Sequence, residues 1–131
     1  REFTEPFRTP KNVPTDQLKQ AVHEMGFQVV VGDRFSHLIG SEAGKGKAVR
    51  QLTQLYQSAL PKSVQLTTIG LGNSPNDLGM LENVKIPVIV PSSQGPHPDL
   101  SERNWQVAPA PGPQGWAMAV EKICQELGIR D

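Results

Sequence analysis

The sequence predicts an α/β protein, and two observations define this class. In the second half of the chain, helix-like stretches alternate with short, continuous apolar runs, which is typical of parallel strands buried between helices. Residues 1–40 differ, because one helix-like stretch is followed there by two β-prone runs around a turn. A length of 131 residues suits one compact folding unit and leaves little room for two.

The first part of the chain is expected to hold one helix and one hairpin. Residues 1–14 are rich in proline and predict extended or irregular structure. Thr15 is a candidate cap for a helix that Gly26 would end. The runs FQVVV at 27–31 and FSHLI at 35–39 surround a Gly-Asp pair, which is typical of two strands joined by a tight turn.

The rest of the chain is expected to alternate between helices and strands. The first of its helices carries an apolar stripe that includes Leu52, Leu55 and Tyr56. The predicted segments, in chain order, are a helix over 48–60, a strand over 63–71, a short helix within 73–84, a strand over 86–90, a surface loop over 91–104, a short strand at 105–108 and a helix over 115–128.

Composition and charge exclude several classes of function. Thirteen Lys and Arg residues balance thirteen Asp and Glu residues, which argues against a nucleic-acid or anionic-membrane partner. A single cysteine, Cys124, allows no intrachain disulfide and argues against a cysteine-based zinc site. The sequence has neither an apolar run as long as a membrane span nor a recognisable secretory signal, so we expect a cytoplasmic protein.

A polar turn after the predicted strand 63–71 is the first candidate site. The segment GLGNSPNDLGML brings Asn73, Ser74, Asn76 and Asp77 close to a strand end, where ligands bind in open α/β sheets. Such oxygen-bearing side chains suit Mg²⁺, or a phosphate that backbone amides hold. The same residue types also build ordinary turns and helix caps, so both interpretations stay open.

A glycine-rich stretch, GSEAGKGKAV, is the second candidate site. It is not a phosphate-binding loop of the Walker type, because only three residues separate Gly40 from Gly44 and no Ser or Thr follows Lys45. A lysine at a helix start is still unusual, since the helix dipole disfavours it there. Lys45 or Lys47 could therefore meet an anion, although a solvated lysine beside a loop is the simpler interpretation.

The predicted hairpin carries a third candidate. Arg34 and His37 flank or occupy its second strand, and Arg8 precedes the helix. Arginine suits bidentate contacts with phosphate or carboxylate groups, so these residues could form an anion-binding patch. From the pattern alone, a solvated arginine and a structural histidine are the better interpretation, because most surface charges are simply solvated.

The two glycine-rich motifs together resemble those of a known superfamily. KGKAVRQL is similar to the third motif of the haloacid dehalogenase superfamily, and GLGNSPNDLGML is similar to its fourth motif. TEPF, GDRFSHLIG, IPVIV and GPQGW extend the resemblance over nearly the whole chain, to the mannosyl-3-phosphoglycerate phosphatase family. This resemblance implies a Rossmann-like parallel-sheet core, of which residues 41–131 would form the C-terminal half. Residues 1–40 would be the end of an α+β cap domain.

The resemblance also implies roles for individual residues. It implies an Mg²⁺-dependent phosphatase in which Lys45 is catalytic and steadies the phosphoryl group. Asn73 and Asp77 would then lie at the metal. The substrate, a small phosphorylated sugar, would be bound by Ser74, Asn76, Arg34 and His37. Positioning and charge neutralisation dominate phosphoryl transfer, which a lysine and a metal ion supply.

Two departures from the family pattern affect these expectations. No aspartate stands in a DxDGT-like context, which is the family's source of nucleophile and general acid; the aspartates are Asp16, Asp33, Asp77, Asp99 and Asp131. Asn73 also replaces a carboxylate. Its amide oxygen can ligate Mg²⁺ but adds no charge, so the affinity for the metal should fall.

We therefore expect the C-terminal part of a phosphomonoester hydrolase that forms an aspartyl-phosphate in its intact state. This chain alone should have little or no activity, because the nucleophile is missing. The alternatives are a non-catalytic phosphosugar-binding or oligomerising module, or an enzyme whose first half comes from a separate chain. A half-sheet would expose a strand edge, so we also expect copies of the chain to associate.

Overall fold

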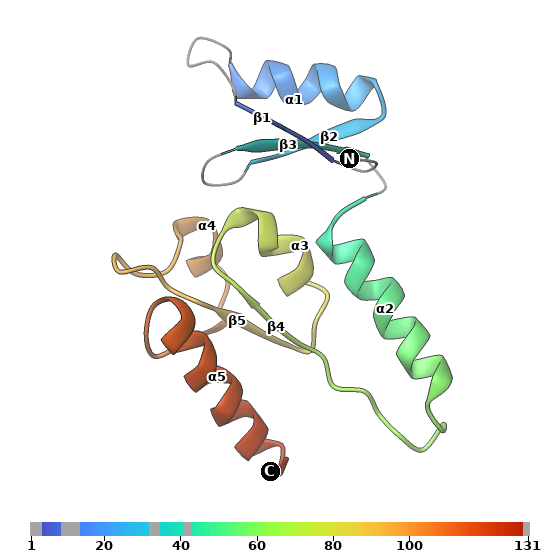
Figure 1. Cartoon of the computed structure of the whole chain (residues 1–131), viewed down its shortest axis with the longest axis vertical. Coiled ribbons are helices and arrows are strands. Elements are labelled where there is room, and N and C mark those ends of the chain that lie inside the picture. Colours follow the sequence, from blue (N-terminus) through green and yellow to red (C-terminus); the bar gives the residue numbers. More distant parts are fainter. Residues whose placement is uncertain (1–3, 9–13, 32–34, 41–42, 130–131) are drawn as a thin grey trace.

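The computed structural model describes residues 4–8, 14–31, 35–40 and 43–129, which form two sheets with their helices (Figure 1). The first sheet is antiparallel and has the strand order β1-β3-β2. Its strands are β1 (Thr4–Phe7), β2 (Phe27–Val31) and β3 (Ser36–Gly40), and α1 (Thr15–Glu24) lies against it. The predicted hairpin is thus confirmed, while its turn lies outside the described residues.

Two details of this sheet differ from the sequence-based expectation. The proline-rich start forms a third strand, β1, which tolerates Pro6 because it lies at the edge of the sheet. Thr15 does not cap the helix: it is the first helical residue, Pro14 precedes it, and no side chain caps this end. The fixed backbone of Pro14 is compatible with the extended geometry of a cap position, so the boundary lies one residue earlier than expected.

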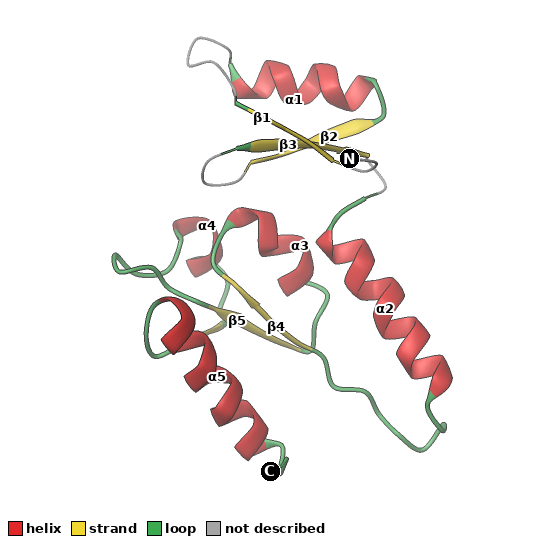
Figure 2. Cartoon of the chain, viewed as in Figure 1, coloured by secondary structure: helices red, strands yellow, loops and turns green. Residues whose placement is uncertain are grey.

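The second sheet is parallel, as predicted, with the strand order β4-β5-β6 (Figure 2). Its strands are β4 (Ile69–Gly72), β5 (Ile86–Ile89) and β6 (Gln106–Val107). The strand expected over 63–71 begins only at Ile69, because β5, its partner, begins at Ile86, which is paired with Ile69. The accompanying helices are α2 (Lys45–Ala59), the short 3-10 turn η1 (Pro75–Asp77), α3 (Leu78–Leu81), α4 (Pro98–Ser101) and α5 (Gly112–Glu126).

Helices cover both faces of the parallel sheet. Successive residues of a strand point to opposite faces, and β5 shows this with two fully buried neighbours. Val88 packs with Ala119 and Ile123 of α5, whereas Ile89 packs with Leu81 of α3 and with the α4 residue Leu100. The result is a layered α/β/α core. Within the described ranges, no helix is long and apolar enough to cross a membrane.

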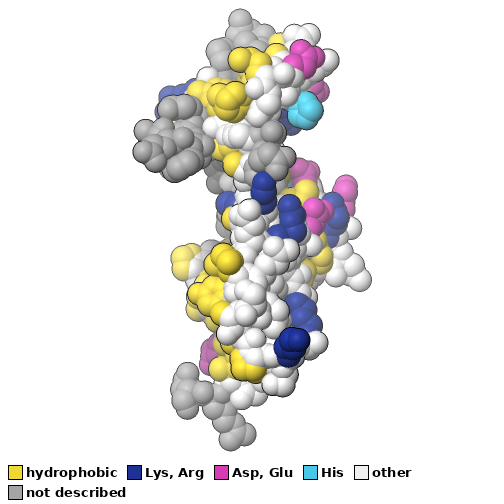
Figure 3. Space-filling view, turned by 90° about the vertical axis from the view of Figure 1, so that its right-hand side faces the viewer, with side chains coloured by type: hydrophobic (Ala, Val, Ile, Leu, Met, Phe, Trp, Pro, Cys, Tyr) yellow, Lys and Arg dark blue, Asp and Glu magenta, His cyan; other side chains and the backbone are white. Residues whose placement is uncertain are grey.

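The apolar stripe of α2 is only partly used. Leu52, Leu55 and Tyr56 are 54%, 67% and 58% exposed, although their spacing predicts a buried face. The start of α2 contacts α3, but the rest of the helix stands away from β4 (Figure 1). A groove of about 280 Å³ lies between them, lined mainly by apolar side chains, and apolar groups gather on this side of the lower half of the molecule (Figure 3). β4 is also an edge strand.

We propose that copies of this chain associate through the exposed stripe of α2 and the edge of β4. An unpaired strand edge beside an apolar groove is a template for pairing with another chain. Sedimentation velocity should therefore give a mass above the 14.3 kDa of one copy. Leu52→Lys combined with Leu55→Lys should shift the distribution towards the monomer.

The matched control for this experiment is Gln54→Lys, which adds a charge to α2 at another exposed position, off the stripe. This variant should associate as the unmodified chain does. A purely monomeric unmodified chain, or equal effects of the stripe and control variants, would contradict the proposal.

Candidate functional site

The two motifs singled out in the sequence meet at the carboxyl end of β4. The strand ends at Gly72, where an added Cβ would stand 2.5 Å from the Cβ of Asp77. Gly72 therefore lets η1 fold back so closely that Asp77 is only 7% exposed. The start of α2 reaches the same point, because Lys45 Nζ donates to Asp77 Oδ1 at 2.5 Å. This ion pair joins residues that are 32 positions apart.

Both carboxylate oxygens of Asp77 accept hydrogen bonds from protein groups. Its Oδ2 accepts hydrogen bonds from the backbone N–H groups of Asn73, at 3.0 Å, and Ser74, at 3.4 Å. The other oxygen, Oδ1, accepts from Lys45. A buried carboxylate is costly unless such donors surround it, so this arrangement stabilises the turn as well as the lysine.

Ser74 and Asn76 complete the turn. Ser74 is buried, and its hydroxyl donates to Asn76 Oδ1. Ser74 and Asp77 also form a capping box at η1. The cap interpretation of these residues is therefore confirmed, and any functional role must coexist with it. The half-buried Asn76 lines a cleft, and of these two residues it is the one placed to meet a ligand there.

The position of Lys45 depends on a close approach of two helices. Gly46 is buried, and an added Cβ there would lie 2.5 Å from the carbonyl oxygen of Gly79 in α3. Only glycine allows this contact without moving α2. The helix begins after Gly44, and no side chain caps its first turn. The helix dipole disfavours Lys45 at this end, and the contact with Asp77 offsets that effect.

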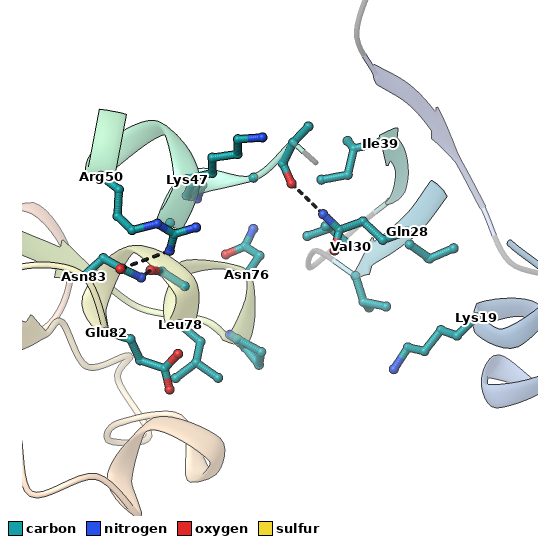
Figure 4. A pocket seen from close by; sticks show the side chains of 18 residues that line it. Lys19, Gln28, Val30, Ile39, Lys47, Arg50, Asn76, Leu78, Glu82 and Asn83 are labelled. Atoms are coloured by element: carbon teal, nitrogen blue, oxygen red, sulfur yellow. Dashed lines mark hydrogen bonds between the residues drawn. The ribbon is translucent and has the colours of Figure 1, made fainter. Parts of the chain in front are cut away.

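A cleft of about 600 Å³, drawn in Figure 4, has Lys45 among its lining residues. Its walls come from α1 and β2 on one side and from α2, η1 and α3 on the other. Arg50 projects over this second wall and donates to Asn83 Oδ1 at 3.0 Å. The cationic residues that line the cleft are Lys19, Lys45, Lys47 and Arg50.

The hairpin residues predicted to bind substrate are placed differently. Arg34 lies outside the described residues. His37 lies on β3 opposite Val30, and the register puts both on one face of the sheet with Ile39. Val30 and Ile39 line the cleft, whereas His37 is not among the described lining residues.

Sequence analysis missed two cleft residues, Lys19 and Gln28. Gln28 Nε2 donates to the carbonyl oxygens of Ala43, at 2.6 Å, and Gly40, at 3.4 Å, which ties β2 to the segment that leads into α2. The signal for Gln28 was a lone polar residue in the apolar run FQVVV. Lys19 gave no such signal, because a lysine on an amphipathic helix is ordinary.

A second hollow, of about 530 Å³, lies on the other side of the turn. Asn73 lines it together with Asp77, and the half-exposed Trp116 of α5 forms part of its wall. Asn73 is itself exposed, so its amide is available to a ligand or to further protein.

The predicted metal ligands, Asn73 and Asp77, stay a prediction. The described part of the chain contains no group of three or more His, Cys, Asp or Glu residues that could hold a metal ion. Both oxygens of Asp77 already accept hydrogen bonds, one of them from a cation. Asn73 offers one neutral oxygen, whereas Mg²⁺ prefers one or two carboxylates.

The comparisons with solved structures define the class of fold. A Thermoplasma acidophilum protein, 0175, matches with a TM-score of 0.70 and 18% identity over 99% of this chain and 52% of its own. The sucrose-phosphatase of Synechocystis, solved with sucrose and phosphate, matches at 0.68 and 21% over 96% of this chain and 52% of its own. A haloacid dehalogenase-like hydrolase of Bacillus subtilis, yhjK, matches at 0.55 and 18% over 90% and 43%. The fold is thus that of haloacid dehalogenase-like hydrolases, as predicted.

Curated sequences then identify particular relatives. A glucosyl-3-phosphoglycerate/mannosyl-3-phosphoglycerate phosphatase of Persephonella marina is 33% identical over 127 residues, which are 97% of this chain and 46% of the relative. The protein of the same name from Methanococcoides burtonii is 35% identical over 122 residues, 92% of this chain and 43% of its own. The predicted resemblance to these phosphatases is confirmed. The chain spans about half the length of these relatives, and no family model matches it.

Replacing Gly46 by alanine should destabilise the site. The added Cβ would collide with the Gly79 carbonyl, so α2 must move away from α3. Overpacking of this kind costs about 1–3 kcal/mol, which chemical denaturation would detect as a lower free energy of unfolding. Gly79→Ala is the control, because its Cβ would meet nothing closer than 3.6 Å. Equal losses in both variants would refute the close-approach argument.

Asp77→Asn should lower the free energy of unfolding by about 2 kcal/mol. The substitution removes a charged hydrogen-bond acceptor and turns an amide N–H₂ group towards hydrogen-bond donors of the turn or of Lys45. Urea denaturation measures the change. Asp99→Asn removes the same charge from an exposed position and should change the free energy of unfolding by at most about 0.5 kcal/mol. If the two variants lose stability equally, Asp77 does not organise this turn.

Proposed function

We propose that this chain forms part of the active site of a haloacid dehalogenase-type phosphatase that hydrolyses a sugar phosphoglycerate. The observation that carries the proposal is the contact with Asp77 of Lys45, which lines the cationic cleft. This contact brings together the two motifs that resemble the superfamily. Homology to glucosyl/mannosyl-3-phosphoglycerate phosphatases over nearly the whole chain supports the choice of substrate class.

In this proposal, the residues of the cleft bind and orient the phosphoryl group. The Lys45 ammonium is half-exposed, so it can donate to a phosphoryl oxygen while Asp77 holds it in place. A preorganised cation lowers the energy of the charged transition state because it does not have to reorient during the reaction. Asn76 presents its amide to the same cleft.

The two sheets would then serve as cap and core. Residues 1–40 would form the end of the cap, whose strand β2 closes the cleft above the turn, and residues 41–131 would form the C-terminal half of the core. The cleft lies between these parts, so a bound substrate would be enclosed by both. Such enclosure excludes water and strengthens the interaction with Lys45.

The nucleophile and the remaining metal ligands would come from protein outside this sequence. Asp77 is unsuited to attack phosphorus, because its carboxylate oxygens accept hydrogen bonds from backbone amides and from Lys45. We therefore assign the aspartyl-phosphate to an aspartate of the intact protein. Mg²⁺ would bind only when additional carboxylates join Asn73 and Asp77.

The second candidate function is a phosphosugar-binding module without catalysis. The capping role of Ser74 and Asp77 favours it, because both residues have a structural purpose that needs no metal. The neutral side chain of Asn73 favours it as well. In this case the chain would retain the cationic cleft and bind its ligand without cleaving it.

The full-length product of the gene should release phosphate from mannosyl-3-phosphoglycerate when Mg²⁺ is present. Lys45→Ala should reduce kcat by about 100-fold or more, because a preorganised donor to the phosphoryl group is lost. The 131-residue chain should release none. Phosphate release is measured at saturating substrate, with and without a chelator.

Lys62→Ala is the matched control, since Lys62 is exposed and does not line the cleft. It should leave kcat unchanged. Turnover by the 131-residue chain alone would overturn the assignment of the nucleophile to protein outside this sequence, and full activity of Lys45→Ala would overturn the proposed role of Lys45. Ligand binding without turnover by the full-length product would favour the binding module.

A further inference from the structure

Lys19 reaches the cleft from α1, on the side opposite to α2 and α3. Figure 4 shows its ammonium directed into the open space, across from Arg50 and Asn83. Within the described residues, Lys19 has no hydrogen bond or ion pair. Two cations on the opposite wall do have partners: Arg50 donates a hydrogen bond to Asn83, and Lys45 forms an ion pair with Asp77. Lys19 is therefore a charged group of the cleft that has no charged or hydrogen-bonding partner among the described residues.

The charges that line the cleft are unbalanced. Among the described lining residues, the acidic one is Glu82, against the four cationic residues named above. Arg103 Nη2 lies 2.8 Å from Glu82 Oε1, so this carboxylate already has its counter-charge. The whole chain has a formal net charge of zero, so the excess of cations is local to the cleft. A strongly anionic ligand suits such a surface.

The cations stand on two separate walls. Lys45 belongs to the wall formed by α2, η1 and α3, and Lys19 belongs to the wall formed by α1 and β2. Gln28 holds the wall of α1 and β2 in place, because its side-chain amide donates to the carbonyl oxygens of Gly40 and Ala43 just before α2. A volume of about 600 Å³ is within the range of small-molecule sites, and it leaves room for more than a phosphate group.

We propose that Lys19 forms a subsite for a second anionic group of the substrate, a carboxylate, at the end of the cleft away from Lys45. The proposal rests on the proposed function, in which Lys45 holds the phosphoryl group. An ammonium donates up to three hydrogen bonds and suits a carboxylate without requiring planar geometry. Lys19 would then select phosphomonoesters of a hydroxy acid over phosphomonoesters of neutral alcohols.

Two small ligands test the subsite. 3-Phosphoglycerate carries a phosphate and a carboxylate, whereas glycerol 3-phosphate carries the same phosphate with a neutral hydroxymethyl group. Isothermal titration calorimetry with the unmodified chain should show that 3-phosphoglycerate binds more tightly, by about tenfold, as expected for one charge-assisted hydrogen bond. Lys19→Gln should abolish this preference and leave the affinity for glycerol 3-phosphate unchanged.

Lys62→Gln, at an exposed position away from the cleft, should keep the full preference. Circular dichroism should give the same spectrum for all three proteins, since Lys19 is exposed. If Lys19→Gln retains the preference, or lowers the affinity for both ligands equally, the subsite proposal is wrong while the phosphate site at Lys45 stands. If neither ligand binds to the unmodified chain, the phosphate site of the proposed function is wrong, and the subsite with it.

Discussion

The ion pair between Lys45 and Asp77 is the interaction on which the candidate site depends. It crosses from the first turn of α2 to the turn after β4, and it fixes the mutual position of two motifs that are far apart in the sequence. Two glycines make it possible. Gly72 lets Asp77 pack against the end of its own strand, and Gly46 lets α2 approach α3. Larger side chains at either position would separate the charged groups.

The same ion pair bears on the predicted magnesium site, which stays a prediction. Asp77 already neutralises Lys45 and accepts amide hydrogen bonds, so a bound metal ion would share its carboxylate with these donors. The exposed amide of Asn73 faces a second hollow, beside Trp116. Further acidic groups arriving from that side would change the balance of charge around Asp77. The cleft side of the site therefore carries an excess of cationic side chains, whereas the other side opens onto the second hollow.

Two surfaces of the chain have the character of interfaces. The sequence makes helix α2 amphipathic, yet within the described residues no layer packs on its apolar stripe. The edge of β4 lies next to the same groove. Both surfaces lie open within the described residues, and the chain spans about half the length of the curated relatives it matches.

The sequence by itself determined the order of the longer helices and strands, the parallel sheet, the hairpin and the two motifs, but neither the edge strand β1 nor the short helix α4, which lies in the segment expected to be a surface loop. Each predicted feature follows from local periodicity, from turn residues or from a contiguous pattern, so neighbours along the chain were sufficient. The tertiary structure alone decided that Asp77 holds Lys45, that Gln28 ties β2 to the start of α2, and that Lys19 faces the cleft. Those contacts join residues from different elements, and their geometry depends on how closely the helices and sheets pack. How closely these elements pack is set only when the whole chain folds, so the local sequence alone does not reveal the contacts.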